Sequence, residues 1–239
     1  MGANGTQRDE NQVAVEPRAA DAGRSGEPAR RYADADNKRS IFTPIFLILL
    51  VISLMGNVSL FAKYLQNGAD RQADAGRGII ETGTFLRNDL ADIRSELDRL
   101  ARDLSLEDRM LTKQNLARLT MNAAERMTGL LSAADGQNGR EPLGDRLDKA
   151  AAFMNGASEA LIGIGNHSEP FTAEEQAYIA MLRQSFKTLN ETAAPLVFKS
   201  DSGSNEARQV AAGGDWVDVA YGLADAISAN ALPPYQAAE

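Results

Sequence analysis

One stretch of the chain is apolar throughout. Residues 41–62 read IFTPIFLILLVISLMGNVSLFA and carry no charged side chain. At about 1.5 Å per residue, a helix of this length spans roughly 33 Å, enough for a hydrocarbon core about 30 Å thick. A buried globular helix is one alternative; a cleaved signal peptide fits less well, because its apolar core is only about 7–15 residues long. The pattern favours a retained single membrane span, with anchor side chains including Ile41, Phe46, Leu50, Leu54 and Leu60.

Beyond the span, apolar residues recur at helical spacing. Six apolar residues follow one another at alternating intervals of four and three residues, and such a seam is typical of packed helices. This pattern predicts a long first helix over about residues 64–104. The seam consists of Leu86, Leu90, Ile93, Leu97, Leu100 and Leu104. The pattern leaves open whether the seam faces the chain's own core or forms a homodimer through Leu86, Leu90, Ile93, Leu97 and Leu100. The glycines within residues 68–83 suggest a looser connection to the span.

Capping and breaking signals divide the rest of the chain into further helices. Residues 105–108 (SLED) and 172–175 (TAEE) resemble capping boxes that start a second and a fourth helix. Residues 135–139 (DGQNG) form a break, and a third helix follows over about 144–164. On the second helix, the predicted apolar face consists of Leu106, Met110, Leu116, Leu119, Ala123, Met127 and Leu130 or Leu131. Residues 199–206 (KSDSGSNE) suggest a loop or linker, and a last helix covers about 215–229.

These patterns predict an all-α fold in which one N-terminal transmembrane helix precedes an antiparallel helical bundle with a long first helix. The predicted parts are a disordered tail (1–40), the transmembrane helix (41–62), an extracytoplasmic bundle (63–198), a linker (199–214), the last bundle helix (215–231) and a C-terminal tail (232–239). The tail before the span has few large apolar side chains to bury, which is why we expect disorder there.

Charge suggests an orientation for the span. Four basic residues flank its N-terminal side and three flank the other side, so the positive-inside rule favours a cytoplasmic N-terminus and an outer bundle. These residues are Arg30, Arg31, Lys38 and Arg39 before the span, and Lys63, Arg71 and Arg77 after it. The tail is neutral, with seven basic and seven acidic residues, so the net charge of −8 belongs to the part after the span.

Composition removes several kinds of chemistry. The chain has no Cys, which excludes disulfides, iron–sulfur clusters, thiolate zinc sites and cysteine nucleophiles, and its single His excludes a multi-histidine metal site. The acidic balance argues against nucleic acid as a partner. We predict no catalytic, cofactor-binding or metal-binding residue. Most outer carboxylates fall outside the apolar stripes, as on a solvated helix face, although a Glu/Asp pair for glycoside cleavage stays a rival interpretation.

The only tryptophan stands out as a candidate partner-binding residue. Trp216 and Asp218 lie at the start of the last predicted helix, and tryptophan is over-represented among interface hot spots. The alternative is that Trp216 anchors this helix in the core. His167 lies in a polar segment, NHSEP, where an ordinary loop histidine is the simpler interpretation.

Three segments resemble the N-terminal helical region of the YpeB family of sporulation and germination membrane proteins. They are residues 169–175 (EPFTAEE), residues 215–223 (DWVDVAYGL) and the polar–apolar pattern of residues 104–131, and the resemblance extends over about residues 80–232. Proteins of that family continue into PepSY domains, which are missing here. The resemblance implies a cytoplasmic or spore inner membrane and partnership with the cortex-lytic enzyme SleB.

The sequence therefore predicts a membrane-anchored, non-enzymatic helical module that tethers or stabilises a spore-cortex-lytic enzyme. Two alternatives are an extracytoplasmic sensory domain of four-helix type that works with a separate signalling partner, and an enzyme acting on cell-wall polymer.

Overall fold

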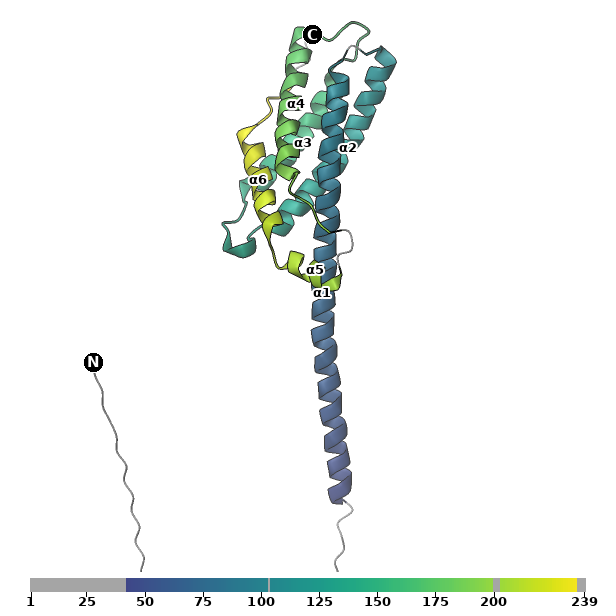
Figure 1. Ribbon diagram of the computed structural model, residues 1–239, viewed down its shortest axis with the longest axis vertical. Helices are drawn as coiled ribbons and strands as arrows, with labels where there is room; N and C mark the ends of the chain where they lie inside the picture. The colour runs from purple at the N-terminus through teal and green to yellow at the C-terminus, as the bar shows by residue number, and fades with distance from the viewer. Residues whose placement is uncertain (1–41, 103, 200–202, 236–239) are drawn as a thin grey trace, which may run out of the picture. The chain divides into compact units, whose positions relative to one another are not determined.

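A computed structural model describes residues 42–102, 104–199 and 203–235, and all regular structure in these ranges is helical (Figure 1). The tails that include residues 1–40 and 236–239 lie outside the described residues, as does Ile41. The helices are α1 (Phe42–Leu100), α2 (Leu106–Ala134), a 3₁₀ turn η1 (Gln137–Gly139), α3 (Asp145–Gly163), α4 (Ala173–Ala193), α5 (Ser204–Ala211) and α6 (Asp215–Ala229). The predicted all-α class is confirmed.

The predicted span and the first bundle helix form one continuous helix, α1. A window of this helix is long and apolar enough to cross a membrane, and none of that window is buried within the chain. The anchor side chains Phe46, Leu50, Leu54 and Leu60 are each more than half exposed. The glycines after the span do not interrupt α1, so the looser connection suggested by the sequence is not found.

The seam of α1 faces the chain's own core. Leu86, Leu90, Ile93, Leu97 and Leu100 are all 0% exposed, and they share one hydrophobic core with residues of α2, α3, α4 and α6. A homodimer through these five residues would therefore require the bundle to open. The helix ends at Leu100, before the predicted Leu104, and the main helices then alternate in direction as expected for an antiparallel bundle (Figure 1).

The predicted capping box forms in full at Thr172, whereas Ser105 forms only the N-cap half of one. The Ser105 hydroxyl accepts a hydrogen bond from the Asp108 N–H (3.2 Å) at the start of α2. At the start of α4, the Thr172 hydroxyl accepts from the Glu175 N–H (3.2 Å), and the Thr172 N–H donates to the Glu175 carboxylate (2.8 Å). The single bond at the start of α2 and the reciprocal pair at the start of α4 satisfy backbone donors that a helix start leaves free, which helps to fix where both helices begin.

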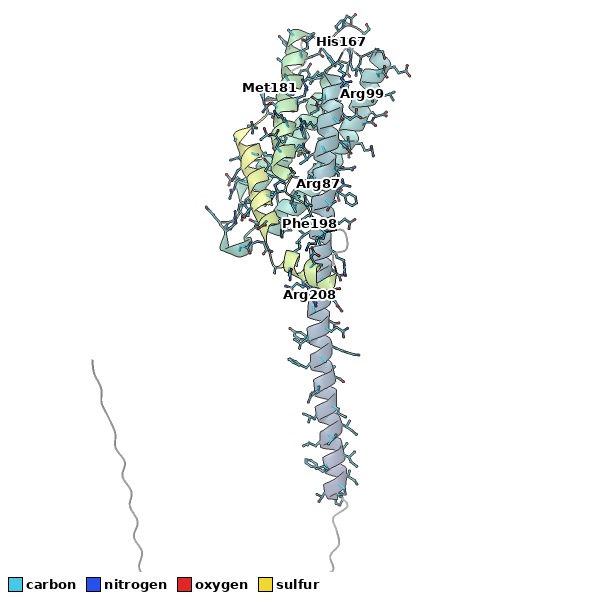
Figure 2. All side chains as sticks on the ribbon, in the orientation of Figure 1. Arg87, Arg99, His167, Met181, Phe198 and Arg208 are labelled. Carbon is cyan, nitrogen blue, oxygen red and sulfur yellow. The ribbon has the colours of Figure 1, made fainter. Side chains whose placement is uncertain are left out.

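The predicted linker contains a helix. Within residues 199–214, α5 packs its fully buried Ala207 against α1 at Gly76. A Cβ atom at residue 76 would overlap the backbone carbonyl of Ala207, so this close approach requires glycine. Gly83 similarly makes room for the ring of Phe198, which Figure 2 labels beside α1. Gly76 and Gly83 of α1 thus allow other parts of the chain to pack closely against this helix.

Candidate functional site

The structure separates the two residues predicted to bind a partner. Trp216 is 5% exposed, and its indole N–H donates to the backbone carbonyl of Val210 (2.9 Å). This position fits the core-anchor alternative and leaves almost no ring surface for a partner. Asp218 is exposed on the same helix and forms an ion pair with Arg140 from the segment after η1. The two side chains therefore do not form one accessible site.

A buried polar cluster lies where the α3–α4 loop meets α2 and α4, at the end of the bundle where Figure 2 labels His167. From α2, Arg109 is 2% exposed and its Nη1 donates to the carbonyls of His167 and Glu169, both at 3.0 Å. Its guanidinium also lies 4.3 Å from the centre of the Phe171 ring. Arg109 thereby fixes the path of the loop.

Lys113, one turn further along α2, holds the end of α3. Its ammonium donates to the carbonyls of Ile164 (2.6 Å) and Ile162 (3.2 Å) and to the side-chain oxygen of Asn166. A cation at this place is favourable because the last carbonyls of a helix lack partners within it. Burial lowers the pKa of Lys113, an effect that the nearby Glu175 carboxylate opposes and Arg109 reinforces.

Glu175 completes the cluster from the first turn of α4. Its carboxylate accepts hydrogen bonds from the backbone N–H groups of Gly165 (2.6 Å) and Thr172 (2.8 Å), and its Oε2 lies 3.0 Å from Nε2 of His167. Burial acts to raise the pKa of Glu175, but these hydrogen bonds outweigh burial and the net pKa lies below its usual value. Glu175 is therefore an ionised acceptor at neutral pH.

The bonding in this cluster favours a structural role. Lys113 uses three donors on three acceptors, so no lone pair is free for a nucleophile or base. Glu175 with a lowered pKa is a poor general acid. The exception is Nε of Arg109, which is buried without a hydrogen-bond partner. The cluster clamps the α3–α4 loop and so builds one wall of the cavity beside it.

That cavity is an apolar groove between the first half of α2 and the end of α3, with a volume of about 770 Å³. Its exposed apolar side chains are Leu106, Met110, Leu111 and Ile162, the last of which is 64% exposed. Lys113 and Asn166 of the polar cluster also line it, as do Glu107 and Gln114. A largely apolar concavity with a few polar groups is the usual composition of a binding site.

The groove corrects the predicted face of α2. Leu106 and Met110 were assigned to the buried face, but they are exposed, and Arg109, Thr112 and Lys113 are buried instead. The physical reason is helical phase: at about 100° per residue, Arg109, Thr112 and Lys113 lie within about 60° of the direction of Leu116, whereas Met110 lies about 120° from it. The buried face of α2 is identified by following the helical spacing of its core positions, even where a position holds a polar residue.

Comparison of the chain with models of protein families, with curated proteins and with solved structures finds no match. In the part of the chain that the structure describes, no group of three or more His, Asp or Glu side chains is arranged to hold a metal ion. The candidate site is therefore identified from the structure alone. It is the apolar groove beside α2, and the buried charged residues Arg109, Lys113 and Glu175 hold the loop that forms one of its walls.

Proposed function

We propose that this protein is a membrane-anchored, non-enzymatic helical interaction module. The observation that carries the proposal is the dual character of α1, which is exposed and apolar along its first part and supplies the centre of the bundle core along its last part. One helix thus joins a segment suited to lipid to a segment that organises a folded domain. The N-terminus is on the cytoplasmic side of the cytoplasmic membrane in this proposal, and the bundle is outside.

The groove is where the partner binds. Its occupant is an apolar helical segment of an envelope protein, because the groove residues Leu106, Met110, Gln114 and Ala117 recur along α2 at the spacing that faces one neighbouring helix. Lys113 and Glu175 are fully engaged with the loop, so the partner meets a wall that is already in place. Because this wall is already ordered, less conformational entropy is lost when the partner binds.

Site-specific photo-crosslinking in living cells tests this function. A photoreactive residue placed at Met110, Leu111 or Ile162 is expected to capture the same partner, and Ile162→Lys is expected to reduce capture from Met110 at least tenfold. Met121 provides the matched control, because it lies on the same helix, is 69% exposed and does not line the groove. Equal capture from Met121 would contradict a specific groove.

The tethering of a cortex-lytic enzyme stays a prediction that rests on the YpeB resemblance alone. It requires that the protein captured from Met110 be such an enzyme and that capture occur in sporulating cells. A different partner at the same positions would remove the germination role and leave the anchored module in place. Release of peptidoglycan fragments by the purified chain would contradict the non-enzymatic proposal.

One observation favours the sensory alternative. The groove volume of about 770 Å³ lies within the range of small-molecule sites, roughly 300–1,000 Å³. In that case amino acids, carboxylic acids or sugars added to the full-length chain in lipid nanodiscs would raise its unfolding temperature, and Ile162→Lys would abolish the rise. The absence of any shift across such a panel argues for the interaction module.

A further inference from the structure

The segment that follows α6 folds back over the bundle and reaches the end of α3. The hydroxyl of Tyr178, in the second turn of α4, donates a hydrogen bond to the backbone carbonyl of Pro233 (2.7 Å). The rings of Tyr178 and Tyr235 meet edge to face, with their centres 5.2 Å apart. Leu232 and Tyr235 are partly buried against the hydrophobic core. Residues 231–235, which we call the clasp, therefore have a defined place on the bundle.

The last residue of α3, Gly163, makes room for the clasp. Its φ is not positive, so the backbone does not require glycine there, and glycine is less favourable than alanine within a helix. A Cβ atom built on Gly163 would lie 3.1 Å from the ring of Tyr235, which is closer than ordinary van der Waals contact. The absence of a side chain at residue 163 thus allows the Tyr235 ring to lie directly on the end of α3.

The clasp also contacts the polar cluster. Burial raises the pKa of Tyr235, and the negative charge and hydrogen bonding of the Glu175 carboxylate raise it further. The same carboxylate accepts hydrogen bonds from the N–H groups of Gly165 and Thr172, which lie near the two ends of the α3–α4 loop. Glu175 therefore connects the clasp to this loop.

The part of α3 that the clasp covers also forms a wall of the groove. Ile162 and Asn166, on either side of Gly163 in the sequence, both line the groove. From α2, Lys113 holds this turn of the chain by the carbonyls of Ile162 and Ile164. The clasp holds the same turn by packing on Gly163. The wall therefore has two attachments, and only the second comes from a segment outside the helices.

We propose that the clasp controls the partner groove. While residues 231–235 lie on Gly163, the end of α3 keeps the shape that the partner binds, and release of the clasp loosens this wall and weakens binding. A short segment without regular secondary structure opens at a lower free energy than the helices around it, so release leaves the bundle folded. This inference rests on the proposed function, since it assigns a control to the groove named there.

Hydrogen exchange of the full-length chain in nanodiscs tests the clasp without any partner. Tyr235→Ala is expected to make the amides of residues 162–172 exchange at least fivefold faster, because the ring no longer covers Gly163. Pro234→Ala is the matched control within the clasp, since Pro234 is exposed, and it should leave this exchange unchanged. Unchanged exchange in α1 and α2 of the same samples would show that the effect is local.

A second variant weakens the clasp from the side of the bundle. Tyr178→Phe keeps the buried ring and removes only the hydroxyl that binds the Pro233 carbonyl, so residues 162–172 should exchange about twofold faster. This variant decides the question if Tyr235→Ala fails to fold. Unchanged exchange of residues 162–172 in both variants, or exchange that rises equally in all helices in both, would overturn the inference.

Photo-crosslinking from Met110 then connects the clasp to the groove. Tyr235→Ala is expected to lower capture of the partner at least fivefold, whereas Pro234→Ala should leave capture unchanged. Faster loop exchange with undiminished capture would overturn control of the groove by the clasp and leave the proposed function intact. No capture even from the parent protein would contradict the proposed function, and the control assigned to the clasp would fall with it.

Discussion

At the scale of single residues, the buried charges are the least expected feature of the protein. Arg109 and Lys113 occupy positions where the phase of α2 calls for apolar side chains, and each meets backbone carbonyls that helix ends and loops leave free. Burying a cation is costly unless it is fully hydrogen-bonded. The carbonyls of the α3–α4 segment provide these bonds to Lys113 and to Nη1 of Arg109, although not to Nε of Arg109, so the loop and the two cations stabilise each other.

Glu175 allows this stabilisation to be measured. Glu175→Gln is expected to lower the free energy of unfolding by about 1–3 kcal/mol at pH 7, because the amide nitrogen of Gln cannot accept the Thr172 or Gly165 N–H. Because the pKa of Glu175 is lowered in the folded state, its contribution is present above the ordinary pKa of about 4.3 and is lost as pH falls through the folded value.

The measurement is chemical denaturation of the full-length chain in nanodiscs at a series of pH values. The difference between the parent protein and Glu175→Gln should shrink as the pH falls below about 4.3. Glu174→Gln is the matched control, since Glu174 is the exposed neighbour on the same helix turn and its loss should change stability by less than about 0.5 kcal/mol. A difference that is independent of pH would contradict an ionised Glu175.

The orientation of the leucine seam leads to a second prediction. Leu97→Ala is expected to destabilise the chain by about 2–5 kcal/mol, since Leu97 is 0% exposed and its removal leaves a cavity. Leu111→Ala, at a half-exposed position in the groove, should cost less than about 1 kcal/mol. Similar losses for the two variants in the same denaturation experiment would show that the seam does not form the core.

At the scale of helices, the sequence predicts the features that follow periodic spacing or capping signals. It does not predict α5 or the groove, which depart from those rules. The seam from Leu86 to Leu100, the N-cap at Ser105 and the capping box at Thr172 follow local rules, and the structure contains all three. Helix α5 was missed because its eight residues include few apolar ones and depend on a tertiary contact with Gly76. The groove was missed because Leu106 and Met110 are apolar but out of phase with the core.

The contact between α5 and α1 leads to a third prediction. Gly76→Ala is expected to displace α5, because the new methyl group would overlap the Ala207 carbonyl, and amide hydrogens of residues 204–211 should exchange faster. Gly68→Ala, where no atom lies within 4 Å, should leave that exchange unchanged and support the helix by up to about 1 kcal/mol. Unchanged exchange in Gly76→Ala would contradict the close approach.

At the scale of the whole molecule, the orientation proposed from flanking charge leads to a fourth prediction. With no natural cysteine, a single cysteine reports its own side of the membrane. Met121→Cys, on an exposed position of α2, is expected to react with a membrane-impermeant maleimide in intact cells, whereas a cysteine at Ser25 is expected to react only after lysis. The reverse pattern would place the bundle in the cytoplasm.

In the proposed orientation, the continuity of α1 also determines where a protease could release the bundle from the membrane. The first residue of α1 buried against the bundle is Ala73, and the apolar stretch ends at Ala62, just before Lys63. A protease that cuts within residues 63–72, where Lys63 and Arg71 offer trypsin-like sites, would release a soluble domain with its central helix complete. A cut beyond Ile79 would leave part of that helix behind and expose the core. Only a cut within residues 63–72 would therefore release the domain and keep it folded.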